Sequence, residues 1–459
     1  MVATYAAAAV LCTIAAAAAP ADEDTDLARI PDAPAVAAAP LSAPRRASAR
    51  LYLEDALTLA TRRAPVVPFP PPPPYRWQNR ISADAVAEWS VRPSLKLFLS
   101  DRVDVIAQED ATWWSRGTVH NELREGYASW QPRPRVYLEV GRINARNGVA
   151  LGFNPTDVFR ARTLVGQASL DPSVLSRNRL GTLMARAQVI GRAGALSVMY
   201  APKLFEPSAI GSDAVGVDPR FDATNAAHRV LVTAGGNAGD LSMQAMAYFE
   251  PGRPKVGLAL TRPLGSSVVA YAEWALSHEA DLVARALDYG RRTGTLPAGT
   301  PDPLAADPSQ GWRNDLAAGA SWTIATLLTL NLEYHFHQGA LSAGDWARWF
   351  AAGRAVPAIA PELWYIRGYA ADQQEPASQH NAFLRIAWPN AGLSDLEVDA
   401  FAFVSLHDGS VLTQTSAIYA ISDRWTLTFS FSASVGSPQS ERGSLPQAAS
   451  GILDLVLYL

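Results

Sequence analysis

Apolar and polar side chains alternate along most of the chain after residue 48, in segments of roughly ten residues separated by turn residues. In Leu328–His337 the even positions carry leucine or aromatic residues, whereas the odd positions carry threonine, asparagine, glutamate and histidine. The same period recurs in Leu183–Val189, His380–Trp388 and Arg424–Ala433. A period of two predicts strands with one apolar face, and many strands of this length are typical of a transmembrane β-barrel.

Tryptophans near the ends of the predicted strands support a membrane setting. Those at positions 130, 322, 388 and 425 fit an aromatic belt at the level of the lipid head groups. The loops 278–311 and 339–378 carry four further aromatic residues, Trp346, Trp349, Trp364 and Tyr365. We interpret these four as anchors at the lipopolysaccharide boundary, with the binding of sugar rings as the alternative.

The last segment, Gly451–Leu459, alternates leucine with other residue types up to the end of the chain. An unpaired apolar edge invites aggregation, so we expect this segment to pair with the first strand and close the barrel. The expected partner is Ala49–Thr61, whose leucines alternate around Asp55. This partner makes eighteen strands, whereas a helix at Leu53–Leu57, a good helix-forming sequence, would favour sixteen.

The connections support an up-and-down order, because bacterial barrels alternate short periplasmic turns with longer outer loops. The tight links fall at 92–94, 131–134, 192–193, 236–238, 264–265, 325–327, 389–393 and 422–423. The outer connections are expected at 65–74, 108–118, 145–180, 204–225, 278–311, 339–378 and 436–449, with short ones at 250–253 and 407–409. The predicted fold class is therefore all-β, a transmembrane antiparallel up-and-down β-barrel.

The N-terminal part predicts export. Residues 1–21 resemble a signal peptide, with an apolar run over Ala6–Ala19 and small residues at Ala19 and Ala21. Residues 22–48, rich in alanine, proline and aspartate, predict a disordered periplasmic lead-in, and 49–459 the barrel. No later window approaches ~18 consecutive apolar residues, so transmembrane helices are not expected. The net charge of −4 provides no basic field for nucleic acid.

The loop 145–180 is the main candidate for function. It is rich in glycine, asparagine and arginine, and its short apolar pieces are too hydrophobic for a freely solvated loop. One interpretation folds it into the lumen as a constriction, where arginines select anions. The alternative packs it on the wall with its arginines paired to carboxylates. The predicted pore-lining residues are Arg142, Arg146, Arg160, Arg162, Arg177, Arg179, Arg186, Glu333, His335 and Arg385.

Two blocks resemble known families. The sequence VGRIN at 140–144 followed by NGVALGFNPTD at 147–157 resembles a block of Gram-negative outer-membrane porin-like proteins, and more distantly the alginate-export type of barrel. The resemblance implies an outer-membrane location and passage of a solute or polymer. The closing strand resembles the signal read by the barrel-assembly machinery, although it ends in Leu459 rather than an aromatic residue.

These observations predict a non-enzymatic outer-membrane channel for a small or polymeric solute, anionic if the loop arginines line the pore. The alternatives are a hydrolase on a barrel scaffold and a plugged structural or surface-binding barrel. No catalytic set, metal site or cofactor motif stands out among the scattered histidines. Predicted partners are outer-membrane lipid, lipopolysaccharide and the assembly machinery, with a periplasmic export partner if a polymer passes.

Overall fold

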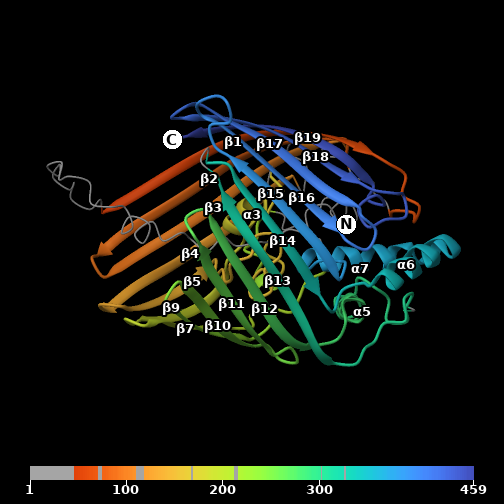
Figure 1. Cartoon of the computed structure of the whole chain (residues 1–459), viewed down its shortest axis with the longest axis horizontal. Coiled ribbons are helices and arrows are strands. Elements are labelled where there is room, and N and C mark those ends of the chain that lie inside the picture. Colours follow the sequence, from red (N-terminus) through yellow and green to blue (C-terminus); the bar gives the residue numbers. More distant parts are fainter. Residues whose placement is uncertain are drawn as a thin grey trace.

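Eighteen antiparallel strands pair edge to edge into a closed barrel, and the two-residue β8 adds a short parallel pairing to β4 (Figure 1). This computed structural model describes residues 46–70, 75–109, 118–166, 169–210, 216–300, 302–324 and 327–459. Consecutive strands are neighbours throughout the barrel, which confirms the predicted all-β, up-and-down fold class.

The strands are β1 Ala47–Arg62, β2 Trp77–Arg92, β3 Leu95–Gln108, β4 Val119–Arg133, β5 Val136–Ile143, β6 Thr182–Ile190, β7 Gly194–Ala201, β8 Gly216–Val217, β9 Arg229–Ala238, β10 Leu241–Phe249, β11 Lys255–Leu264, β12 Val268–Glu279, β13 Gly311–Thr323, β14 Thr329–His337, β15 His380–Trp388, β16 Leu396–Ser405, β17 Val411–Ser422, β18 Trp425–Val435 and β19 Gln447–Tyr458. The helices are α3 Pro172–Arg177, α4 Phe221–Thr224, α5 Leu282–Arg292, α6 Ala343–Ala355, the 3₁₀ turn η1 Pro357–Ile359 and α7 Ala360–Asp372. None of the helices in these ranges is long and apolar enough to span a membrane.

The barrel closes where the sequence predicted. Strand β1 pairs antiparallel with β19 in a register that places Leu57 opposite Leu453 and Tyr52 opposite Tyr458. The alternative helix at Leu53–Leu57 is wrong, because the leucines of β1 alternate to the exposed side while Ala56 is buried. A period of two places all these leucines on one face of a strand, whereas in a helix they would point in different directions.

The outer surface is the apolar face of the alternation, and the lumen is polar. On β14, Leu332 is 61% exposed, whereas its neighbour Glu333 is 1% exposed. The predicted belt residues are all exposed on the outside, beside the short turns at one end of the barrel: Trp130, Trp322, Trp388 and Trp425. Apolar strands with aromatic residues at their ends are the surface that a bilayer covers.

Short turns gather at one end, and the long connections gather at the other. The predicted links at 131–134 and 236–238 lie a few residues too early, because β4 continues to Arg133 and β9 continues to Ala238. The turn after β9 is made at Gly239, whose φ of +59° suits glycine. The predicted links at 325–327 and the connections at 65–74 and 108–118 lie partly outside the described residues.

Helices α5, α6 and α7 stand at the long-loop end (Figure 1) and were not predicted. Their aromatic residues form a core. Trp346, Trp349, Trp364 and Tyr365 are each almost completely buried, so their interpretation as lipopolysaccharide anchors is wrong. The guanidinium of Arg367 lies 4.7 Å to 5.4 Å from the centres of the three indole rings, where burial lowers its pKa to about 9.

The predicted signal peptide at 1–21 and most of the lead-in at 22–48 lie outside the described residues. Ala47 and Ser48, which were assigned to the lead-in, already belong to β1.

Candidate functional site

The loop that follows β5, at 144–181, is bonded to wall strands far around the barrel. Its N–H groups at 149–150 donate to the carboxylate of Glu273 on β12, and those at 151–152 donate to Glu333 on β14 at 2.6 Å and 2.7 Å. Both carboxylates are almost fully buried. Glu333 also accepts from the Tyr271 hydroxyl at 2.7 Å. These contacts place the tip of the loop inside the lumen.

Small residues let this tip approach the wall. A Cβ on Gly152 would lie 2.6 Å from the His335 ring and 2.7 Å from Phe383. Gly148 has a φ of +91°, which other residues rarely adopt. Asn154 then organises the turn, because its side-chain oxygen accepts from the N–H of Asp157 at 3.1 Å and its side-chain nitrogen donates to the carbonyl at 147 at 2.6 Å. The glycine and asparagine content of the loop therefore serves close packing.

The root of the loop is closed by a buried ion pair. Arg179 donates to both carboxylate oxygens of Asp157, at 2.6 Å and 3.1 Å. It also donates to the side-chain oxygen of Asn144 and the carbonyl of Ala145, each at 2.7 Å. The bidentate geometry and the additional acceptors satisfy this guanidinium inside the protein.

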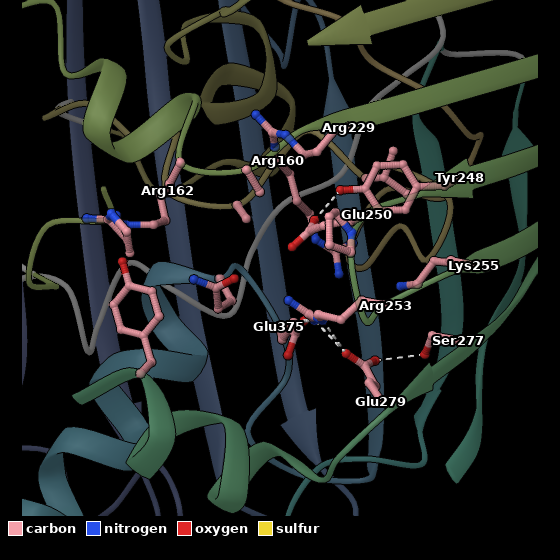
Figure 2. A pocket seen from close by; sticks show the side chains of 18 of the residues that line it. Arg160, Arg162, Arg229, Tyr248, Glu250, Arg253, Lys255, Ser277, Glu279 and Glu375 are labelled. Atoms are coloured by element: carbon pink, nitrogen blue, oxygen red, sulfur yellow. Dashed lines mark hydrogen bonds and ion pairs between the residues drawn. The ribbon is translucent and has the colours of Figure 1, made fainter. Parts of the chain in front are cut away.

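Beside the loop lies a cavity of about 410 Å³ (Figure 2), here called the inner cavity. The loop residues at 157–162, strands β9 to β12 and the segment at 369–375 all contribute to its lining. Seven cationic side chains and four carboxylates line it: Arg160, Arg162, Lys203, Arg229, Arg253, Lys255 and Arg292, with Asp157, Glu250, Glu279 and Glu375. The lining therefore carries an excess of positive charge.

Two of these arginines have no carboxylate in ion-pair contact among the described residues. Arg160 donates to the Asn154 carbonyl and its guanidinium lies 4.6 Å from the centre of the Phe153 ring. Burial lowers the pKa of Arg160. Arg229 donates to a backbone carbonyl at 224, and its guanidinium lies 4.9 Å from the ring centre of Phe159. Both arginines line the cavity, and neither is in ion-pair contact with a carboxylate of the described residues.

Of the ten predicted pore-lining residues, Arg160 and Arg162 line the inner cavity. Arg162 is bonded differently from Arg160. Its Nε lies 3.0 Å from the carboxylate of Asp372, and it donates to the Ser208 hydroxyl at 2.9 Å. Burial raises the pKa of Asp372, and Arg162 opposes this rise.

Four more of the predicted residues, Arg142, Arg179, Arg186 and Arg385, are bonded to the loop or the wall. Their partners are the Gly181 carbonyl for Arg142, Asp157 for Arg179, Glu139 for Arg186, and Asp171 with Asp399 for Arg385. The loop lies in the lumen, and two of its arginines, Arg162 and Arg179, form ion pairs with Asp372 and Asp157.

The remaining four do not line the inner cavity. Glu333 and His335 lie beneath the loop tip, with His335 Nε2 at 2.7 Å from Glu333 Oε2. Arg146 is half-buried, and burial followed by the nearby charge of Arg179 lowers its pKa. Arg177 is exposed at the end of α3. The described residues contain no group of three or more acidic, histidine or cysteine side chains arranged for a metal.

The sequence analysis did not select Arg229, Arg253, Lys255 or Glu273. The alternation of β12 places Glu273 on the lumen face, so its burial could have been predicted from the sequence. Arg253 lies in a short turn with no pattern to mark it. The charge of Glu279 raises the pKa of Arg253, against the effect of burial. These residues come together only through barrel closure.

No protein-family model and no curated protein sequence matches the chain. Several solved porins share its fold. A BenF-like porin from Pseudomonas fluorescens Pf-5 superposes with a TM-score of 0.54 at 9% identity, covering 90% of this chain and 98% of the porin. OccK2 (OpdF) of Pseudomonas aeruginosa in complex with glucuronate gives 0.53 at 11% identity, covering 90% and 98%. OpdK of Pseudomonas aeruginosa with vanillate gives 0.51 at 9%, covering 90% and 98%. At these identities the likeness establishes the porin-like barrel fold.

Proposed function

We propose that the chain is an outer-membrane channel through which small anionic solutes diffuse passively, without catalysis. The observation that carries the proposal is the inner cavity, where Arg160 and Arg229 present positive charge beside a loop held inside the lumen by Glu273 and Glu333. Cationic side chains lining a narrow path favour anions. The apolar belt of the barrel suits an outer-membrane location.

The structural neighbours support a solute with a carboxylate. Two of them, OccK2 and OpdK, were solved with glucuronate and vanillate, which both carry this group. Export of a polymer of the alginate type gains no support from these porins. A periplasmic export partner and the barrel-assembly machinery remain predictions, as does the pore-lining role of all ten predicted residues.

Conductance in planar bilayers under a KCl gradient tests the proposal. The wild-type protein is expected to conduct and to prefer chloride over potassium. Arg160→Gln is expected to lower this preference more than Arg162→Gln, because Asp372 already neutralises Arg162. A silent bilayer or a preference for potassium would contradict the proposed function, and equal effects of the two variants would contradict the role given to Arg160.

One observation favours testing the hydrolase alternative as well. Ser405 Oγ lies 2.8 Å from His407 Nδ1, and His407 Nε2 lies 3.1 Å from Asp408, so the three residue types of a serine–histidine–aspartate triad are in contact, but with the two ring nitrogens exchanged. Ser405 is completely buried, so a substrate has no access to its hydroxyl. Esterase activity that disappears in Ser405→Ala would support the hydrolase.

A further inference from the structure

A second cavity adjoins the first. This outer cavity, of about 670 Å³, is lined by α5, the turn at 250–253 and the segment at 302–310. The residues that line both cavities form the wall between them: Pro251, Arg253, Glu279, Arg292 and Tyr369. Helix α5 stands at the long-loop end (Figure 1), so a solute that moves from the outer to the inner cavity passes this wall.

The wall is held by an ion-pair network. Arg253 donates through Nε to Glu279 at 2.9 Å. Glu279 accepts from the Ser277 hydroxyl at 2.7 Å and lies 3.5 Å from Arg285. Arg285 in turn binds both carboxylate oxygens of Glu375, at 3.1 Å and 2.6 Å. Each buried carboxylate thus contacts more than one donor.

Arg253 is the member of this network that can move. Its side chain is 31% exposed, whereas those of Glu279 and Arg285 are 4% and 7% exposed. Its backbone N–H is fixed to the Glu250 carbonyl at 2.9 Å, so the side chain can rotate while the turn stays in place. If Arg253 leaves, Glu279 keeps Ser277 and Arg285. Arg285 is shared with Glu375, so it compensates Glu279 only in part, and the departure of Arg253 has a cost that the new bond to the solute must offset.

We propose that Arg253 exchanges its bond to Glu279 for a bond to the anionic group of the solute, and so passes the solute between the two cavities. This inference rests on the proposed function. One charge-assisted hydrogen bond of Arg253 replaces another of the same kind, which offsets the loss of the Arg253–Glu279 bond. The effect of Arg253 on specificity then depends on Glu279, which competes with the solute for its guanidinium, and not on the charge of Arg253 alone.

Reversal potentials in a gradient of potassium glucuronate test the exchange, with glucuronate as the probe anion. Arg253→Gln is expected to lower the permeability ratio of glucuronate to potassium roughly tenfold, because a charge-assisted bond is lost. Glu279→Gln is expected to raise the ratio, because it frees Arg253. Arg292→Gln, the matched control in the same wall, should change it less than about twofold, because its side chain is 59% exposed and is paired with Asp288 in screened solvent.

The double variant Arg253→Gln with Glu279→Gln decides between exchange and a simple charge effect, because it has the net charge of the wild type. Exchange predicts the low ratio of Arg253→Gln, whereas a simple field effect predicts the wild-type ratio and would overturn the inference. Equal effects of Arg253→Gln and Arg292→Gln would overturn it too. Far-UV circular dichroism verifies that each variant keeps its barrel. A wild-type protein that conducts no current contradicts the proposed function instead.

Discussion

Two regions of the same loop, its root and the part that faces the inner cavity, differ in the partners of their arginines. At the root, Arg179 is 1% exposed and donates to Asp157 in bidentate geometry, to Asn144 and to the Ala145 carbonyl. At the face of the inner cavity, Arg160 has a carbonyl and an aromatic ring but no carboxylate in ion-pair contact among the described residues. The ion pair of Arg179 fixes the root of the loop, whereas the positive charge of Arg160 at the cavity is available to bind a solute.

The difference shows that arginine content alone does not define a pore. A paired arginine contributes little field to the lumen, because its carboxylate cancels the charge at short range. An arginine without a carboxylate keeps its field, at a cost in desolvation that aromatic contact and carbonyl bonding partly offset. The loop therefore combines a structural ion pair, at Asp157 and Arg179, with a charge available for a solute, at Arg160.

The largest expected effect comes from breaking the root. Arg179→Met leaves the Asp157 carboxylate buried without its partner, and loss of one member of a buried pair costs about 3–5 kcal/mol. Hydrogen exchange of the loop amides at 144–181 should show a fall of this size in the free energy of local opening. Arg160→Gln is the matched comparison and should change this free energy by less than about 1 kcal/mol.

The double variant Asp157→Asn with Arg179→Met removes both charges and should recover part of the loss. If Arg179→Met and Arg160→Gln open the loop equally, the distinction between a structural root and a functional face is wrong.

The sequence predicted the barrel because the feature that determines it is local. The alternation on β14 assigns Leu332 to lipid and Glu333 to the lumen without knowledge of any other strand. The closure between β1 and β19 followed from the need to pair an apolar edge. The helices at the long-loop end were missed, because the core around Arg367 depends on tertiary contacts among three tryptophans.

The site was predicted less completely than the fold, for the same reason. Whether an arginine faces a cavity or a carboxylate depends on residues distant in the sequence. Arg162 forms an ion pair with Asp372, far away in the sequence, and Arg179 forms one with Asp157, which is nearer in the sequence. The alternation identifies lumen positions, but it does not identify pairs.

A smaller effect is expected at the loop tip. Glu333→Ala leaves the N–H groups at 151–152 and the Tyr271 hydroxyl without their acceptor, at about 1–3 kcal/mol for each unsatisfied group, less what water recovers in the lumen. We expect the opening free energy of residues 149–152 to fall by about 2 kcal/mol in hydrogen exchange. Glu333→Gln keeps one carbonyl acceptor and should lose less. A tip that opens while the root stays protected would show that the tip and the root are fixed independently.

The smallest effect is expected at Arg177, which lies in the same loop and bears the same charge but is exposed. Arg177→Gln should leave the opening free energy within about 0.5 kcal/mol of wild type, since exposed substitutions rarely exceed this. It should also leave the chloride preference almost unchanged in 0.15 M salt, where screening limits an exposed charge to a range of about 8 Å. Bilayer recordings beside Arg160→Gln make the comparison direct. If Arg177→Gln lowers the chloride preference as much as Arg160→Gln does, selectivity depends on the total charge of the loop and not on its unpaired cavity-facing arginine.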